Sequence, residues 1–205
     1  MNAAAPAAPH GHGAPTILLL PGWLDSAPTH WQSRWEALHG DLRVTQSDWQ
    51  WPRRGDWMAR LDEVVQAQRG EVALVAHSLG CQLVAAWAAH TSHAGRVRAA
   101  LLVAPPDVER EDMPPPLHAW RPIVRARLPF ASLAVLSSDD PYCSPEHAQA
   151  MVADWGCEQR NVGARGHLND ASGLGDWPEA RRWLEALIGV ARPVPDAQRG
   201  PEPPR

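Results

Sequence analysis

Length and charge exclude several classes of protein at the outset. The chain has 205 residues, enough for one domain with a substantial core and too few for two ordinary domains. Its 19 basic and 23 acidic residues give a net charge of -4, which implies no nucleic-acid partner. No apolar run approaches the roughly 18 residues of a membrane span.

The two ends of the chain differ in composition from its middle. Residues 1–14 are rich in Ala, Pro, Gly and His, and residues 192–205 are rich in Pro, so we expect two disordered tails around one domain at 15–191. The first tail lacks the charged and apolar regions of a signal peptide. The cysteines, Cys81, Cys143 and Cys157, are odd in number and form no metal-like cluster, which favours free thiols and a cytoplasmic location.

Between these tails, short apolar runs alternate with stretches of helical periodicity. The predicted strands are Thr16–Leu20, Leu42–Gln46, Val72–Ala76, Val97–Val103, Ser132–Ser137 and Glu158–Val162. The predicted helices are Thr29–Leu38, Asp56–Gln68, Gln82–Ala89, Pro145–Trp155 and Trp177–Val190. Strands that alternate with helices predict an α/β fold, here with a six-stranded, mostly parallel sheet flanked by helices. Spacing places Trp31, Trp35 and Leu38 on one helix face, and Asp56 is a candidate N-cap.

The third predicted strand leads into a motif that carries chemistry. Its apolar residues suit a strand that is buried on both faces, and a helix is predicted shortly after it. The segment between them reads Ala76-His77-Ser78-Leu79-Gly80. This order of strand, tight turn with serine, and helix is the context of the nucleophile-elbow pattern G-x-S-x-G, with alanine in place of the first glycine.

A serine on such a turn has two interpretations. The turn holds its hydroxyl clear of the sheet, where the helix dipole and free backbone N–H groups favour developing negative charge. Alternatively, Ser78 only caps the helix that follows. The residues after the other strands decide between the two, because ligands of an open parallel sheet bind at the carboxyl ends of its strands.

The loops after the first two strands offer backbone donors and aromatic side chains. Gly22 lets backbone N–H groups point toward the elbow serine, so an oxyanion hole is expected from the N–H groups of Trp23 and Leu79. The loop after the second strand contains Trp49 and Trp51. We expect Trp23, Trp49 and Trp51 to border a substrate pocket, although tryptophans packed under a loop are an open alternative.

The later loops supply an acid and a base. Asp139 and Asp140 follow the fifth strand, Asp107 follows the fourth, and His167 follows the sixth. Ser, Asp and His therefore occur in the chain order used by α/β-hydrolases, each at the carboxyl end of a strand.

These motifs resemble those of one small α/β-hydrolase family. The motifs are Pro21-Gly22-Trp23, Asp25-Ser26, His30-Trp31-Gln32, Trp35, Ala76-His77-Ser78-Leu79-Gly80, Asp139-Asp140-Pro141-Tyr142, Gly166-His167-Leu168-Asn169, Ser172-Gly173 and Trp177-Pro178. They are similar to those of the YdeN-type serine hydrolases, whose animal relatives are called retinoblastoma-binding protein nine. The resemblance covers roughly residues 16–190, and the partner named in the animal proteins is not carried over, because no Leu-x-Cys-x-Glu motif is found.

The resemblance implies a compact, lidless core and a catalytic triad of Ser78, Asp140 and His167, because the family pattern places the acid directly before the proline. We expect a serine hydrolase that acts on small ester or thioester substrates without a metal or cofactor. A hydrolase-like binding protein without activity, and an acyltransferase or peptidase with the same triad, remain alternatives. The sequence carries no signal for the oligomeric state.

Overall fold

The structure is a computed structural model that describes residues 13–189. Its strands are β1 (Thr16–Leu20), β2 (Leu42–Arg43), β3 (Val72–His77), β4 (Val97–Val103), β5 (Ala131–Leu136) and β6 (Glu158–Asn161). Its α-helices are α1 (Trp31–His39), α2 (Arg54–Ala67), α3 (Leu79–Ala88), α4 (Pro145–Asp154) and α5 (Pro178–Gly189). The expected tails, 1–14 and 192–205, lie outside the described residues apart from Gly13 and Ala14.

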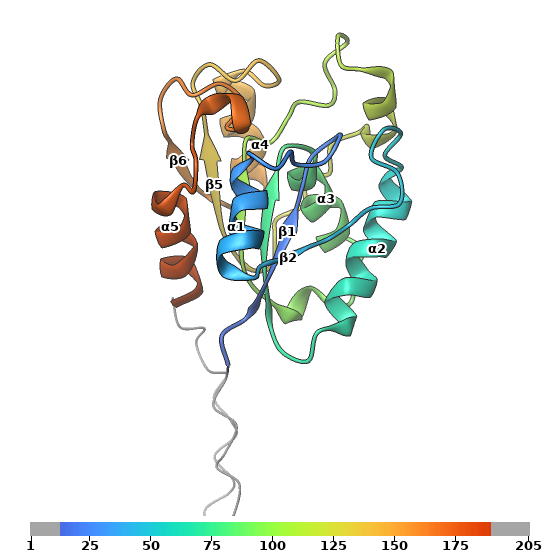
Figure 1. The fold of residues 1–205 in the computed structure, drawn as a ribbon. Helices are drawn as coiled ribbons and strands as arrows, with labels where there is room; N and C mark the ends of the chain where they lie inside the picture. Colours follow the sequence, from blue (N-terminus) through green and yellow to red (C-terminus); the bar gives the residue numbers. More distant parts are fainter. Residues whose placement is uncertain (1–12, 190–205) are drawn as a thin grey trace, which may run out of the picture.

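The strands form one sheet in the order β2-β1-β3-β4-β5-β6, and every neighbouring pair is parallel. The chain runs outward from β1 to β2, then returns to β3 and continues outward on the other side. The strand order therefore reverses between β1 and β3, where open sheets of this kind leave a crevice beyond the carboxyl ends. This edge is the upper one in Figure 1.

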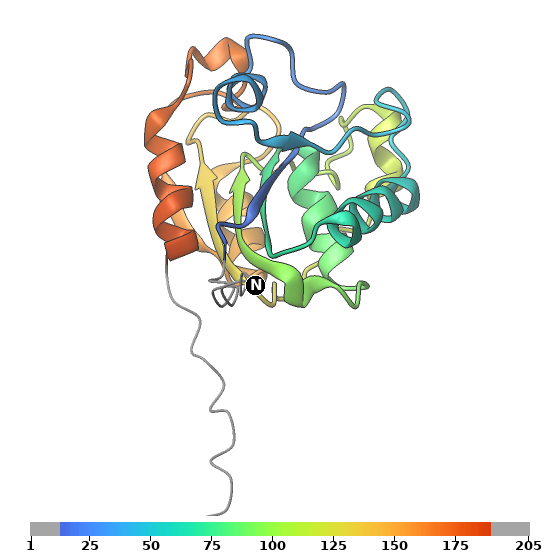
Figure 2. The same cartoon turned by 60° about the horizontal axis from the view of Figure 1, so that its bottom comes forward.

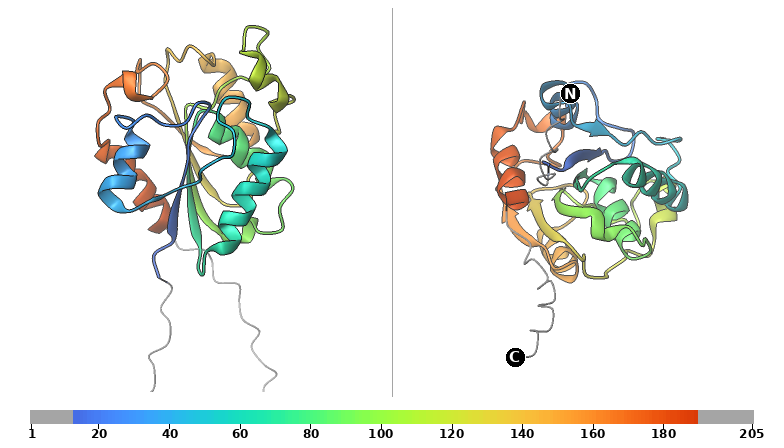
Figure 3. Two further views of the ribbon diagram at one scale, coloured as in Figure 1. Left: turned by 45° about the vertical axis from the view of Figure 1, so that its right-hand side comes forward. Right: turned by 90° about the horizontal axis from the view of Figure 1, so that it is seen from below.

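Alternate residues of the strands supply two separate cores. In β3, Leu74 and Ala76 face a core that includes α2, α3 and α4, whereas Ala73 and Val75 face a core with α1 and α5. Figures 1 and 3 show the two groups of helices on opposite sides of the sheet. Because both faces of β3 are covered, all six of its residues are buried, which is why its first five, Val72–Ala76, read as an uninterrupted apolar run.

The predicted α/β class with a six-stranded parallel sheet is confirmed, and several details are corrected. The second strand has two residues instead of the five predicted, and it lies at the edge of the sheet. Asp56 does not cap α2, because that helix begins two residues earlier, after Arg53, and Asp56 lies in its first turn. Leu38 is 57% exposed, so of the three residues expected on one face of α1 only Trp31 and Trp35 are buried. The predicted end of the last helix, residue 190, lies outside the described residues.

The segment between β4 and β5 crosses the carboxyl edge next to the start of α2 (Figure 2). It contains a short 3-10 helix, η2 (Pro115–Trp120), and the indole of Trp120 donates to the carbonyl of Pro52 at 2.9 Å. Arg54 donates to the carbonyls of Trp120 and Pro122. This segment is therefore tied to the body of the protein. Within residues 13–189, no helix combines the length and apolarity that crossing a membrane requires.

Candidate active site

The turn after β3 holds Ser78 in a backbone conformation that non-glycine residues rarely adopt. Its φ is 53° and its ψ is −124°, and α3 begins at the next residue. The Ser78 N–H donates to the carbonyl of Val103 on the neighbouring strand at 2.9 Å, which fixes the turn against the sheet. Strand, strained turn and helix thus present the serine hydroxyl at the carboxyl edge.

Two glycines allow this turn to pack closely. A Cβ on Gly80 would lie 2.3 Å from the carbonyl oxygen of Leu20, so α3 could not approach β1 as it does. A Cβ on Gly22 would lie 2.7 Å from the Cβ of Ser78. Ala76, which replaces the first glycine of the elbow pattern, is fully buried in β3 without a positive φ. The alanine therefore fits at that position, whereas these two glycines are required by space.

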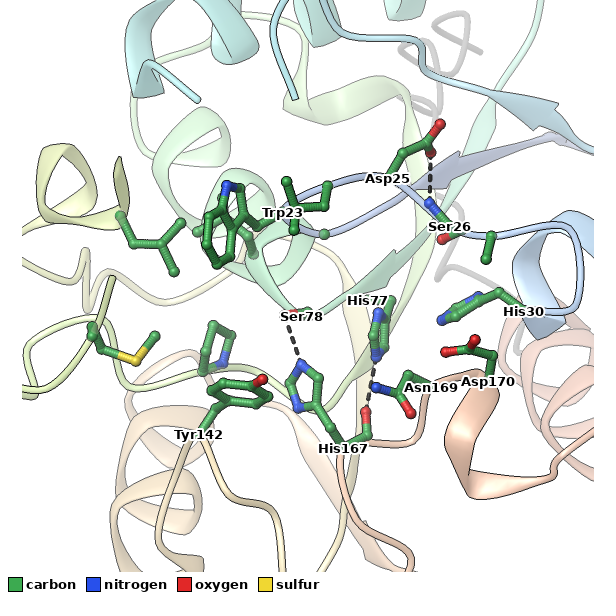
Figure 4. A pocket seen from close by; sticks show the side chains of 17 residues that line it. Trp23, Asp25, Ser26, His30, His77, Ser78, Tyr142, His167, Asn169 and Asp170 are labelled. Atoms are coloured by element: carbon green, nitrogen blue, oxygen red, sulfur yellow. Dashed lines mark hydrogen bonds between the residues drawn. The ribbon is translucent and has the colours of Figure 1, made fainter. Parts of the chain in front are cut away.

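Ser78 is joined by hydrogen bonds to a histidine and an aspartate from two other loops. Its Oγ lies 2.8 Å from Nε2 of His167, as the dashed line in Figure 4 shows. The other ring nitrogen, Nδ1, lies 2.9 Å from each carboxylate oxygen of Asp140. The side chains of His167 and Asp140 are 8% and 5% exposed, so these bonds are shielded from water. The backbone N–H of Tyr142 also donates to Oδ1 of Asp140 at 2.9 Å.

The two other candidate acids have different partners. Asp139 accepts hydrogen bonds from the Ser137 hydroxyl at 2.8 Å and from the Gly166 N–H at 2.7 Å, and these bonds lower the pKa of its carboxyl. Asp139 thus ties the loop after β5 to the residue that precedes His167. Asp107 accepts from the N–H of Glu109, and its other oxygen lies 3.5 Å from His147. Of the three, Asp140 is the one whose carboxylate contacts His167.

Three aromatic side chains hold the loop that carries His167. The indole of Trp31 donates to the carbonyl of Leu168, and Nε2 of His77 donates to the carbonyl of His167, both at 2.9 Å. The ring of Tyr142 packs edge-on against the imidazole of His167, with ring centroids 4.5 Å apart. Leu168 has a φ of 51°, a conformation that these contacts maintain.

His77 is a positioning residue that the sequence-based reasoning did not identify. Its ring is buried, and burial lowers its pKa well below the usual range, so the imidazole is neutral. The hydrogen atom of the neutral ring must be on Nε2, because a backbone carbonyl can only accept. The signal was present in the elbow motif itself, where a histidine directly precedes the serine.

The expected oxyanion donors border the same space. Trp23 and Leu79 both line the cavity above Ser78. Among the backbone hydrogen bonds of the described residues, neither N–H group donates to a protein acceptor. Leu79 is the first residue of α3, where backbone N–H groups have no partner within the helix. Both groups are therefore available to an atom bound in the cavity.

The cavity over Ser78 has a volume of about 490 Å³ and a lining that is partly polar and partly apolar. Ser26, His30, Asn169 and Asp170 lie together at one end, the polar end, and Pro106, Met113 and Leu117 are apolar residues of the lining. Figure 4 shows Trp23 beside Ser78, with the polar side chains beyond His77. A space of this size suits a small organic molecule.

Two of the three tryptophans expected at the pocket do not line this cavity. Trp49 packs against Trp57, with ring centroids 5.3 Å apart, and Trp51 is 61% exposed. Trp23 does line the cavity, and its indole donates to the carbonyl of Gln50. The loop after β2 therefore contacts Trp23 through the carbonyl of Gln50, and its own tryptophans do not line the cavity. Composition alone could not distinguish this role from direct contact with the cavity.

A cluster of two acids and a histidine, and the three cysteines, lie outside the cavity. Among the described residues, one cluster, formed by Asp107, Glu109 and His147, has the spacing of metal ligands, and none of its members lines the cavity. Glu109 already pairs with Arg125 at 3.3 Å. The three cysteines are buried, and burial raises the pKa of each thiol, to about 12 for two of them, so none competes with Ser78 as a nucleophile.

Comparisons with known proteins agree with this fold. The sequence model of the serine hydrolase family matches residues 17–186. No curated protein sequence matches the chain. Among solved structures, a putative YdeN-like hydrolase from Pectobacterium atrosepticum is 27% identical, over 84% of this chain and 90% of its own, with a TM-score of 0.72.

Two more distant structures share the fold. The ydeN gene product of B. subtilis is 18% identical over 85% of this chain and 98% of its own, with a TM-score of 0.66. A carboxylesterase from Bacillus cereus is 16% identical over 86% of this chain and 91% of its own, with a TM-score of 0.57. The chain thus has an α/β-hydrolase fold and belongs to the serine hydrolase family, of the YdeN type.

Proposed function

We propose that this protein hydrolyses small ester or thioester substrates through an acyl-enzyme intermediate on Ser78. The observation that carries the proposal is the continuous hydrogen-bonded path from Ser78 through His167 to Asp140, at 2.8 and 2.9 Å. The path ends at a hydroxyl on a strained turn, inside a cavity. The similarity to structures described as carboxylesterases supports the same class of substrate.

Each member of this path has a defined task in the reaction. Because the carboxylate of Asp140 can only accept, Nδ1 of His167 carries a hydrogen atom, and Nε2 is free to accept the proton of the Ser78 hydroxyl. As that proton moves to Nε2, Oγ forms a bond to the acyl carbon. The imidazolium then returns the proton to the oxygen or sulfur of the leaving group as its bond breaks. Water repeats these steps to release the acid.

The negative charge formed on the acyl oxygen needs donors that are already in place. The N–H groups of Trp23 and Leu79 border the cavity and have no protein acceptor among the described residues. Such donors contribute about 3–4 kcal/mol each to transition-state stabilisation in enzymes where one has been removed. The apolar lining residues, Met113 and Leu117 among them, suit a short acyl or alkyl chain.

We also propose a cytoplasmic location. Cys81, Cys143 and Cys157 are free thiols, as expected of a protein in a reducing compartment.

A fluorophosphonate probe and a series of p-nitrophenyl esters of rising chain length test the proposal. We expect the wild-type protein to be labelled and to prefer short esters, and Ser78→Ala to lose both labelling and turnover while keeping its thermal midpoint. Ser92→Ala removes the same hydroxyl from an exposed serine outside the cavity and serves as the matched control. Undiminished labelling of Ser78→Ala would overturn the proposal, and a wild-type protein inert to both reagents would favour a binding protein without activity.

A further inference from the structure

The polar end of the cavity contains a buried donor that no protein atom satisfies. His30 lines the cavity and is 3% exposed, and its Nε2 has no hydrogen-bond partner. Buried polar groups in proteins are rarely left in this state, so an unpartnered group that lines a cavity is evidence for a bound molecule. Figure 4 shows the ring on the far side of His77 from Ser78.

The fold determines which ring nitrogen of His30 carries the hydrogen atom. His30 precedes α1, and its Nδ1 accepts the backbone N–H of Gln32 at 3.1 Å. A nitrogen that accepts this bond has no hydrogen of its own, so the neutral ring carries its hydrogen on Nε2. Burial, with smaller effects of nearby charges, lowers the pKa of His30 to about 4, which keeps the ring neutral at physiological pH. His30 is therefore a fixed donor.

A carboxylate faces the same space. Asp170 also lines the polar end, is exposed, and lies close enough to His30 for its charge to raise the pKa of that ring. Figure 4 shows the two side chains next to each other. A carboxylate only accepts and the His30 Nε2–H only donates, so a group that satisfies both must accept one hydrogen bond and donate another. A hydroxyl does both, an ammonium cannot accept from His30, and a carboxylate would be repelled by Asp170.

We propose that the polar end of the cavity is a subsite for a hydroxyl group of the substrate, which accepts from Nε2 of His30 and donates to the carboxylate of Asp170. This inference rests on the proposed hydrolase activity and narrows its substrate to small hydroxylated esters. The hydroxyl belongs either to the acyl part or to the alcohol part of the ester. The ring centroids of His30 and His77 are 4.7 Å apart and those of His77 and His167 are 5.0 Å apart, so a small substrate spans from Ser78 to this subsite.

Matched pairs of esters test the subsite. The first pair, p-nitrophenyl β-hydroxybutyrate and p-nitrophenyl butyrate, differs by a hydroxyl on the acyl part. The second, hydroxyethyl butyrate and propyl butyrate, differs by a hydroxyl on the alcohol part. We expect the hydroxylated ester of one pair to have a kcat/KM roughly 10- to 100-fold above that of its partner, because its hydroxyl makes hydrogen bonds to His30 and to the charged Asp170 that the partner cannot make. The pair that responds identifies the part of the substrate that occupies the subsite.

The variant His30→Asn separates the donor from the helix cap. The Asn side-chain oxygen can accept the Gln32 N–H in place of Nδ1, whereas its NH₂ group is too short to reach the position of the Nε2 donor. In the pair that responds, we expect the ratio of kcat/KM for the hydroxylated ester to kcat/KM for its partner to fall to about one. A general loss of positioning would lower both values and leave this ratio unchanged. Thr29→Ala, an exposed change in the same loop, is the matched control and should keep the wild-type ratio. Asp170→Ala changes an exposed side chain, so it should fold even if His30→Asn does not, and it should lower the ratio several-fold.

The outcomes distinguish this inference from the function on which it rests. If the wild-type protein is labelled by fluorophosphonate and hydrolyses esters but shows a ratio of about one in both pairs, the subsite is refuted and the hydrolase stands. A high ratio that neither His30→Asn nor Asp170→Ala lowers also refutes it, because another group then binds the hydroxyl. A protein that is neither labelled nor active on any ester refutes the hydrolase and the subsite together.

Discussion

Replacement of Asp140 by asparagine is a direct test of the acid that orients His167. Nδ1 of His167 lies 2.9 Å from both oxygens of Asp140, and the Tyr142 N–H donates to one of them, Oδ1. In Asp140→Asn the amide oxygen would stay with this N–H, so the new NH₂ group would face Nδ1. A donor opposite Nδ1 favours the tautomer with hydrogen on Nε2, which cannot accept the proton of Ser78.

The expected loss of rate is large. In the chymotrypsin-type case, the same exchange of acid for amide costs about 10⁴ in kcat through the wrong tautomer. At about 1.36 kcal/mol for each factor of ten, this corresponds to about 5.4 kcal/mol of transition-state stabilisation. The side chains of His167 and Asp140 are 8% and 5% exposed, so solvent does not screen the interaction between them. We therefore expect a loss of about 10⁴ in kcat with p-nitrophenyl acetate, with little change in KM.

The neighbouring acids provide the controls for this measurement. In Asp139→Asn the amide oxygen can still accept from Ser137 and Gly166, so we expect kcat to change by no more than about threefold. Asp107→Asn should also stay within about threefold, because Asp107 accepts from Glu109 and faces His147. Near-normal turnover in Asp140→Asn, together with a crippled Asp107→Asn, would show that the acid belongs to the other loop.

Three further predictions follow from packing, burial and exposure. Gly22→Ala should lower kcat/KM by about 10²-fold and also lower urea stability, because its Cβ would lie 2.7 Å from the Cβ of Ser78 and would push the nucleophile out of place; an unchanged rate would mean that the turn adapts. Because the pKa of His30 is lowered to about 4 by burial, the unfolded state binds more protons between about pH 6.5 and 4, and stability falls on acidification. Urea titrations at pH 7 and pH 5 should show a loss that is about 2 kcal/mol smaller in His30→Asn than in the wild type, because buried His77 contributes its own loss to both proteins; equal pH dependence in both would refute this reason. Trp23→Ala should change the preferred ester chain length, whereas Trp51→Ala, at a side chain 61% exposed, should change neither preference nor melting temperature.

The sequence predicted those parts of the fold that local patterns determine. Val97–Val103 was predicted with its observed bounds, because its residues from Ala99 onward form an apolar run that is buried on both faces. The edge strand β2 was predicted too long. Its length depends on how many residues pair with β1, and the local sequence does not show where that pairing ends. Asp56 resembled an N-cap, but the structure begins α2 at Arg54, where no side chain caps the helix.

The site was less predictable wherever contacts join distant segments. Ser78, His167 and Asp140 could be named as candidates from motifs and chain order, and the structure brings these three together. His30 could not be recognised as a cavity residue from the sequence. Its ring packs against His77 at the end of β3, far away in the chain, with ring centroids 4.7 Å apart. The role of a tryptophan in a loop depends in the same way on packing that the sequence does not show.

The loop with His167 is anchored to the beginning of the chain. Trp31 donates to the carbonyl of Leu168 and Trp35 to the carbonyl of Asp176, and both indoles belong to α1. Detachment of α1 in mild denaturant would carry the imidazole away from Ser78 while the central strands stay paired. The rate at which fluorophosphonate labels Ser78 therefore reports whether α1 is packed in place. This rate should fall at denaturant concentrations lower than those at which the sheet unfolds.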